Sequence, residues 1–184
     1  MSATVTTPAD SFRYDRLTIA LHWLTAVVVA AQWVIGQSIQ FFERGPQQDD
    51  VRSVHIVLGL GLLALLLVRL VWSKMPWVRQ PVRSGLGDLV ARGLQALLVV
   101  LLVGTILLGL LLAAVKGGSV FTWVTLPPLG GGSQELRHFV GELHEWGANL
   151  ILALVGVHAA AALAHHYVLR DGILRRMLPR GRAA

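Results

Sequence analysis

The sequence of 184 residues contains no cysteine. The chain therefore cannot form a disulfide, an iron–sulfur cluster, a thiolate metal site or a covalent c-type haem linkage. Any metal that it binds must be held by histidine or by oxygen ligands.

Charged residues are also scarce. They make up 14% of the chain, against the ~25% typical of soluble domains, while 54% of the residues are hydrophobic. Long apolar runs lie at residues 17–39, 55–72, 89–115 and 143–169. Each is about as long as the ~20 residues that a helix needs to cross the ~30 Å hydrocarbon core of a bilayer. The sequence therefore predicts an all-α integral membrane protein built as a bundle of four transmembrane helices.

The first apolar run is predicted to be a retained helix. It is too long for the apolar part of a signal peptide, and no small-residue cleavage site follows it. No internal repeat or low-complexity tract divides the sequence. We therefore expect one transmembrane domain over residues 1–184, with a short polar segment at residues 1–12.

Two connections are rich in residues that interrupt helices. Residues 80–87 are expected to form a turn between the second and third helices. Residues 116–140 contain Pro127, Pro128 and a run of three glycines, so this segment cannot stay helical throughout. We expect it to lie along the membrane surface as a loop that includes His138.

Acidic residues are fewer than basic ones, and the net charge is +6. In a soluble protein this excess would suggest a nucleic-acid site, but here the basic residues gather beside particular helix ends. They precede the first run, flank the connection between the second and third, and follow the fourth: Arg13, Arg16, Arg69, Lys74, Arg79, Arg83, Arg92, Arg170, Arg175, Arg176, Arg180 and Arg182. The positive-inside rule then places both termini and that connection in the cytoplasm. The charge is interpreted as membrane topology, and no nucleic-acid partner is expected.

The predicted spans carry histidines, at positions 22, 55, 144, 158 and 165. A strongly polar side chain in hydrocarbon costs on the order of 2 to 3 kcal/mol, so each histidine needs a compensating interaction. For any one of them alone, a hydrogen bond between helices would be sufficient. Their arrangement indicates something more specific.

His144 and His158 are fourteen residues apart on the fourth helix. At ~100° and 1.5 Å per residue they lie within ~40° of one face and ~21 Å apart along the axis. With the predicted topology, His55 can face His144 near the outer surface, and His22 can face His158 near the inner surface. His165 lies only ~20° around the helix from His158, so the spacing leaves it as an alternative partner for His22.

Pairs of imidazoles from opposing helices at two depths are what two b-type haems require. A zinc or copper site would instead gather three or four ligands at one depth. A transporter is disfavoured, because the spans lack paired acidic residues and broken helices. The pattern therefore predicts a membrane electron-transfer protein with two haem b groups.

The segments around these histidines resemble the bacterial cytochrome b561 family. The resemblance is carried by residues 16–23, 55–59, 68–70, 143–145 and 157–167. It covers nearly the whole chain, is strong in the first, second and fourth helices, and is weak in the third helix and the loops.

The resemblance implies a four-helix, di-haem b cytochrome of the bacterial inner membrane. It implies axial pairs of His22 with His158 and of His55 with His144, which decides for His158 over His165. It places His165 in a quinone pocket, together with a basic residue such as Lys74, Arg79 or Arg83. Because the family includes a superoxide oxidase that passes electrons from superoxide to ubiquinone, we expect this activity.

Two arginines are candidates for binding haem propionates. Arg69 ends the second helix and Arg13 precedes the first, and a guanidinium can hold a carboxylate through two hydrogen bonds. Both could equally be ordinary cytoplasmic anchors. The alternative function is a membrane-anchor subunit that relays electrons between quinone and a partner dehydrogenase or hydrogenase. The third helix has no histidine and could pack on the bundle or on such a partner.

Overall fold

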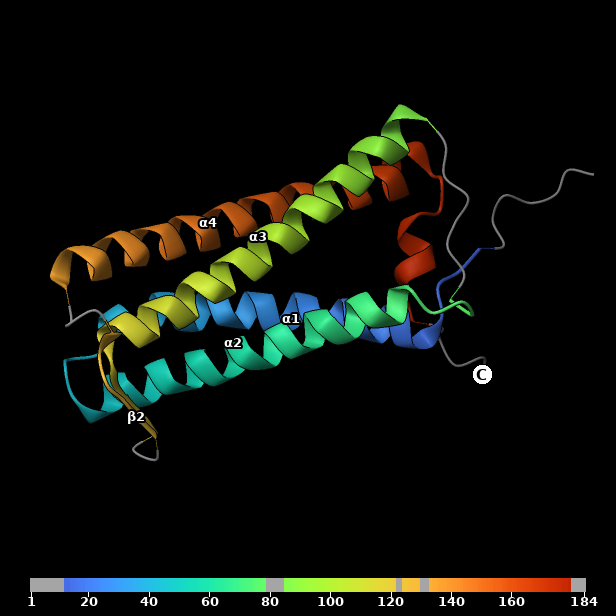
Figure 1. The fold of residues 1–184 in the computed structure, drawn as a ribbon. Helices are drawn as coiled ribbons and strands as arrows, with labels where there is room; N and C mark the ends of the chain where they lie inside the picture. Colours follow the sequence, from blue (N-terminus) through green and yellow to red (C-terminus); the bar gives the residue numbers. More distant parts are fainter. Residues whose placement is uncertain (1–11, 79–84, 122–123, 130–132, 180–184) are drawn as a thin grey trace, which may run out of the picture.

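The computed structural model describes residues 12–78, 85–121, 124–129 and 133–179 (Figure 1). Its long helices are α1 (Arg16–Ser38), α2 (Pro46–Ser73), α3 (Leu86–Lys116) and α4 (Gln134–Ala164). All four are long and apolar enough to cross a membrane. The shortest has 23 residues and reaches about 35 Å, more than the ~30 Å hydrocarbon core. The predicted class, a four-helix all-α membrane protein, is confirmed.

The helix ends follow from local chemistry. Asp15 caps α1, because its carboxylate accepts hydrogen bonds from the backbone N–H of Thr18 at 2.9 Å and from the Thr18 hydroxyl at 2.5 Å. Ser133 caps α4 in the same way through the N–H of Leu136 at 3.3 Å. α3 ends at Lys116 and is followed by Gly117, whose φ of 66° lies in the left-handed region that glycine adopts without strain.

Two helices begin earlier than the hydropathy predicts. α2 starts at Pro46 rather than at residue 55, and α4 starts at Gln134 rather than at residue 143. The added turns carry polar and charged side chains, which lower the hydropathy but are compatible with a helix. The expectation that His138 belongs to a loop is therefore wrong: His138 lies on α4, exposed, with Nδ1 3.5 Å from the Glu142 carboxylate one turn further on.

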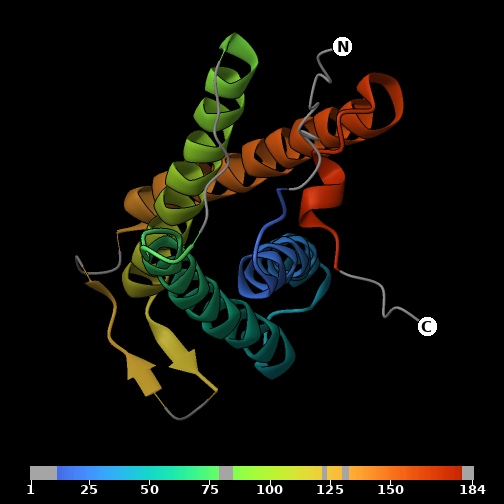
Figure 2. The ribbon, with the colours of Figure 1, turned by 90° about the vertical axis from the view of Figure 1, so that its right-hand side faces the viewer.

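The connection between α3 and α4 contains a short hairpin. β1 (Gly118–Val120) pairs antiparallel with β2 (Val124–Leu126), with Ser119 opposite Thr125 (Figure 2). The backbone N–H of Phe121 donates a 3.0 Å hydrogen bond to the hydroxyl of the buried Ser53 on α2, which ties the hairpin to the bundle. We call this end of the bundle the hairpin end.

At the opposite end, α4 continues into η3 (His165–Leu169), a turn of π-helix, and the chain then forms η4 (Leu174–Met177). η4 returns to α1, because the indole N–H of Trp23 donates to the carbonyl of Met177 at 2.8 Å. The first and last described residues both lie here (Figure 1), so we call this the terminal end.

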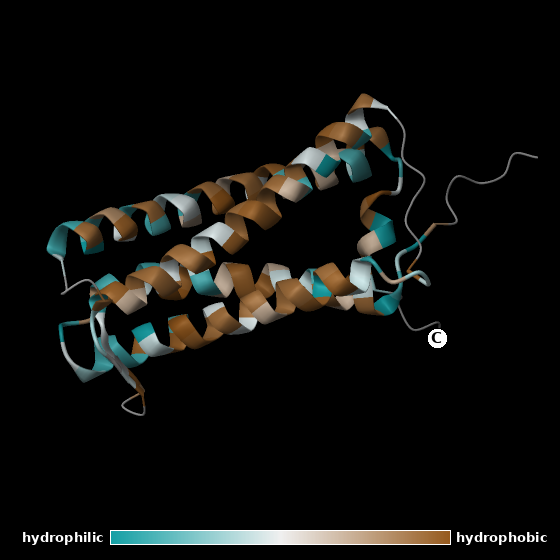
Figure 3. Cartoon of the chain, viewed as in Figure 1, coloured by the Kyte–Doolittle hydropathy of each residue, from teal (hydrophilic) through white to brown (hydrophobic). Residues whose placement is uncertain are grey.

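The helices pack mainly as two pairs, α1 with α2 and α3 with α4, and α1 and α4 make few contacts. Hydrophobic residues predominate along the middle of the helices, and hydrophilic residues are more frequent toward the two ends of the bundle (Figure 3). Many large apolar side chains are exposed, among them Val27, Val100 and Val157. This is the surface expected of helices that face lipid.

Candidate haem centres

At the hairpin end, His55 on α2 faces His144 on α4. The ring centres are 6.0 Å apart and the ring planes cross at 85°. At the terminal end, His22 on α1 faces His158 on α4, with ring centres 6.4 Å apart and planes at 64°. The structure thus brings together the two pairs of rings that the sequence indicates, and α4 contributes one ring to each.

Both separations suit a metal ion held between two imidazoles. With metal–nitrogen bonds of about 2 Å on opposite sides of one ion, two ring centres lie about 6 Å apart. Among the described residues, no group of three or more His, Cys, Asp or Glu side chains could hold a metal ion. Two ligands alone fit a haem, whose macrocycle supplies the other four nitrogens, better than they fit zinc or copper.

In the hairpin-end pair, His144 is held in a defined tautomer. His144 Nδ1 lies 2.8 Å from the backbone carbonyl oxygen of Thr105 on α3. A carbonyl only accepts, so Nδ1 carries the proton and Nε2 keeps the lone pair that a metal requires. Its partner His55 packs beside Gly36 of α1, where an added Cβ would lie 3.1 Å from the ring. His55 Nδ1 is buried and has no hydrogen-bond partner among the described residues.

The terminal-end pair lies beside a cation. Arg69 Nη2 on α2 is 3.3 Å from His22 Nδ1. A guanidinium only donates, so His22 Nδ1 accepts this bond and the proton of the neutral ring lies on Nε2. Binding of a metal through Nε2 therefore requires Arg69 to leave this contact and Nδ1 to take the proton. The position of Arg69 next to the pair suits the acidic propionates of a haem.

Comparison with known proteins identifies the family. The model of the prokaryotic cytochrome b561 family matches residues 13–180. The chain belongs to the prokaryotic cytochrome b561 family. Haem b is therefore its cofactor, and electron transfer in a membrane is its general function. The resemblance noted in the sequence is confirmed.

Similar curated proteins align with this chain over nearly the whole length of both sequences. Cytochrome b562 of Cereibacter sphaeroides is 34% identical over 170 residues, covering 90% of this chain and 94% of its own. Cytochrome b561 homolog 2 of Escherichia coli is 28% identical over 173 residues, with coverage of 90% and 91%. Probable superoxide oxidase CybB of Yersinia pestis is 27% identical over 177 residues, with coverage of 92% and 98%.

His165 of this b561 family protein lies apart from the paired rings and begins η3. Its Nδ1 forms a short hydrogen bond with the carboxylate of Asp171, which also accepts from the backbone N–H of Ile173 at 3.2 Å. Burial raises the pKa of the Asp171 carboxyl, but the hydrogen bonds from His165 and Ile173 outweigh burial and lower it. The partnership of Asp171 with His165 was not predicted. The sequence offers one indication of it, which is that Asp171 is an acidic residue just beyond the fourth apolar run, among several arginines.

The remaining basic candidates are not brought to the paired histidines. Arg13 is exposed ahead of α1, and Lys74 is exposed at the C-terminal end of α2. Arg79 and Arg83 lie outside the described residues. The role expected for these four side chains stays a prediction.

A group of cations at the hairpin end was missed because neighbouring acids conceal it in the sequence. Lys116, at the end of α3, interacts electrostatically with Arg52 and Arg137. Arg52 is paired with Asp49 at 2.8 Å, whereas the buried Nε of Arg137 has no hydrogen-bond partner among the described residues. We call Arg52, Lys116 and Arg137 the cation group.

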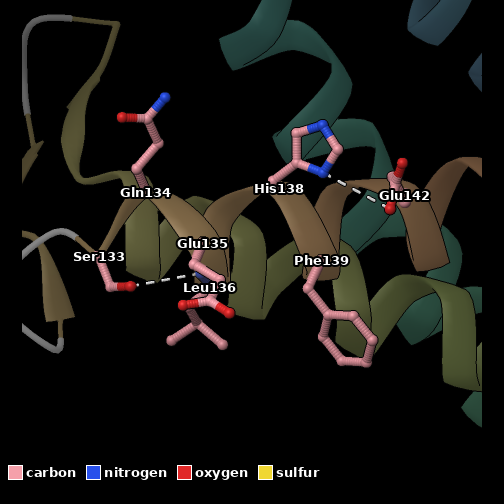
Figure 4. A pocket seen from close by; sticks show the side chains of 7 residues that line it. All are labelled: Ser133, Gln134, Glu135, Leu136, His138, Phe139 and Glu142. Carbon is pink, nitrogen blue, oxygen red and sulfur yellow. Dashed lines mark hydrogen bonds and ion pairs between the residues drawn. The ribbon is translucent and has the colours of Figure 1, made fainter.

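A surface pocket lies over the first turns of α4 (Figure 4). It is lined by Ser133, Gln134, Glu135, Leu136, His138, Phe139 and Glu142. None of the four paired histidines is among these residues. The pocket therefore does not belong to the candidate haem centres.

Proposed function

We propose that the chain binds two haem b groups, one between His55 and His144 and the other between His22 and His158, and passes electrons from superoxide to a membrane quinone. The observation that carries the proposal is the pair of facing imidazoles at each of two depths, 6.0 and 6.4 Å apart. When bound, haem supplies reversible one-electron chemistry at its iron.

α4 sets the geometry of both centres. It provides His144 to one and His158 to the other, and a single uninterrupted helix fixes their ~21 Å separation along the axis. α1 and α2 provide one opposing ring each. The surrounding apolar side chains exclude water, and low solvent access is one of the properties by which a protein sets a haem potential.

The cation group supports superoxide as the electron donor at the hairpin end. Superoxide is an anion, and clustered positive charge raises the local concentration of an anionic substrate and its encounter rate. The name of the Yersinia pestis relative, a probable superoxide oxidase, is consistent with this donor. By the predicted topology, the hairpin end faces away from the cytoplasm.

His165 and Asp171 support quinone reduction at the terminal end. With Nδ1 bonded to the Asp171 carboxylate, a protonated His165 ring has a second N–H at Nε2, which can donate to a quinone oxygen. Lys74 or Arg79 supplies the accompanying positive charge. Two superoxide anions each lose one electron and become dioxygen, while one quinone takes up these two electrons and two protons and becomes a quinol.

Arg69 is proposed to bind a propionate of the terminal-end haem. Its guanidinium is half-buried and already lies beside His22, and within the described residues no carboxylate forms a salt bridge with it. A haem propionate would supply that missing anionic partner.

A second function is a haem-carrying membrane subunit that relays electrons between quinone and a separate dehydrogenase or hydrogenase. It is favoured by the relatives from Escherichia coli and Cereibacter sphaeroides, which are named only as cytochromes. Such a subunit would not turn over superoxide by itself.

The two functions are separated by an assay of the purified chain in liposomes that contain ubiquinone. Superoxide is generated at a constant rate, and dioxygen and quinol formation are recorded. The proposed oxidase forms one quinol for every two superoxide anions consumed, whereas liposomes without quinone show only spontaneous dismutation. Absence of quinol formation by a fully haem-loaded protein would contradict the oxidase function and favour the relay.

A further inference from the structure

α3 supplies none of the paired histidines, yet it contacts the ring of His144 at two points. His144 Nδ1 lies 2.8 Å from the carbonyl oxygen of Thr105. A Cβ added to Gly109 would lie 2.7 Å from His144 Cε1 and 3.1 Å from Nδ1. The ring therefore occupies the space that a side chain at position 109 would fill.

The two contacts belong to one turn of α3. In an α-helix the N–H of residue i bonds the carbonyl of residue i−4, so the carbonyl of Thr105 accepts from Gly109. A carbonyl oxygen has a second lone pair, and the missing side chain at Gly109 leaves it open to His144. Any larger residue at position 109 would block this approach.

A reciprocal contact holds the two helices at this distance. Gly147 on α4, almost one turn beyond His144, faces the side chain of Thr105. A Cβ added to Gly147 would lie 2.5 Å from Thr105 Oγ1. Each helix thus offers a glycine to a side chain of the other, as in other close contacts between membrane helices.

We propose that α3 is the positioning element for His144: the Thr105 carbonyl fixes its tautomer, Gly109 provides the space for its ring, and Gly147 keeps the helices close enough for the hydrogen bond. The proposal rests on the proposed role of His144 as an axial ligand. A ligand that donates its Nδ1 proton to a carbonyl is more basic at Nε2. It favours oxidised iron and lowers the potential of the hairpin-end haem.

The first test substitutes Gly109→Ala in the full-length protein. Redox titration of the visible bands and EPR of the oxidised protein should show a raised potential and a shifted low-spin signal for the hairpin-end haem, with the terminal-end haem unchanged. The matched control is Gly104→Ala on the same helix, where an added Cβ meets nothing within 4 Å. A His22→Ala variant, which removes a terminal-end ligand, assigns the signals.

A second pair of variants keeps the proposal testable if Gly109→Ala fails to assemble. Gly147→Ala should raise the potential of the same haem by separating α3 from α4. Adding Thr105→Ala should restore the potential, because it removes the clashing hydroxyl but leaves the backbone carbonyl.

Two outcomes overturn the proposal: a haem-loaded Gly109→Ala protein that matches Gly104→Ala, or a shift in Gly147→Ala that Thr105→Ala does not reverse. The haem content of the wild-type protein separates these from failure of the proposed function. If the wild type lacks a second haem, the axial role of the histidine pairs is at fault. If it binds two haems and the variants give these results, only the role of α3 is refuted.

Discussion

The Nδ1 atoms of the paired histidines have different surroundings in the structure. His144 donates to a backbone carbonyl, His22 accepts from a guanidinium, and His55 has no partner among the described residues. The two centres therefore differ electrostatically although both consist of two histidines. A nearby cation favours reduced iron, which carries less positive charge, so Arg69 should raise the potential of the terminal-end haem.

Substitution of Arg69→Ala should lower the potential of the terminal-end haem and leave the hairpin-end haem unchanged. In Arg69→Lys the potential of the terminal-end haem should lie between those of the wild type and Arg69→Ala, because lysine keeps the charge but lacks the planar guanidinium. Potentiometric titration of the visible spectrum measures both. The exposed Arg13→Ala serves as control, and an Arg69→Ala protein with wild-type potentials would exclude Arg69 from the centre.

Asp171 gives the terminal end a pH dependence. The pKa of its carboxyl is lower in the folded protein than in the unfolded chain, where it is about 3.9. The carboxylate therefore contributes its full stabilisation above the unfolded-state pKa, and this contribution is lost as the pH falls through the folded-state pKa. The pKa of Asp15 at the same end is also lowered, because hydrogen bonds from Thr18 and Trp72 outweigh burial, and it acts in the same direction.

Hydrogen-exchange protection of residues 165–177, measured between pH 3 and pH 7 and corrected for the intrinsic pH dependence of amide exchange, should therefore fall at the acid end of the range. Asp171→Asn should lower the protection of this segment at neutral pH and weaken the dependence of that protection on pH. The pH dependence that remains is expected to come from Asp15. Glu145→Gln, an exposed acid on α4, is the control. Equal protection in Asp171→Asn and wild type at neutral pH would show that the bond to His165 does not hold η3 in place.

At the scale of secondary structure, apolar run length was sufficient to predict the helices. Histidine spacing indicated that His55 meets His144 but left His158 and His165 as alternatives for His22, and the family resemblance was needed to decide for His158. Helix starts were not predictable from hydropathy, because the first turns of α2 and α4 extend beyond the apolar core with residues such as Asp49 and Glu135. The hairpin and the hydrogen bond to Thr105 depend on tertiary contacts between distant segments. Every residue has a backbone carbonyl, so the sequence does not indicate that the carbonyl of Thr105 accepts this hydrogen bond.

The sharing of α4 by both centres leads to a simple expectation. His144→Ala and His158→Ala should each remove one haem, a different one in each case, and the double variant should remove both. The control is His138→Ala, on the same helix but exposed and paired only with Glu142. Haem extraction and optical difference spectra measure the result, and loss of the same spectral component in both single variants would contradict two separate centres.

At the scale of the whole molecule, the two ends carry different chemistry. The hairpin end has the cation group, and the terminal end has His165 with Asp171 and the returning η4 segment. This polarity suits a path that takes electrons from an anion at one end and reduces quinone at the other.

Lys116→Gln should slow superoxide oxidation several-fold at low salt and weaken its salt dependence, because one charge of the cation group is removed. Arg92→Gln is a matched control, since Arg92 is an exposed cation on the same helix near the terminal end. Steady-state rates between low and physiological ionic strength provide the measurement. Equal slopes for Lys116→Gln and wild type would remove the cation group from the donor site.

The central claim is that two histidine pairs hold two haems, and haem stoichiometry tests it most directly. The purified protein, produced with ample haem, is reduced and oxidised for a difference spectrum, and its haem is extracted and counted per chain. Two non-covalently bound b-type haems per chain are predicted. A single haem would mean that only one pair binds, and no haem would contradict the account as a whole.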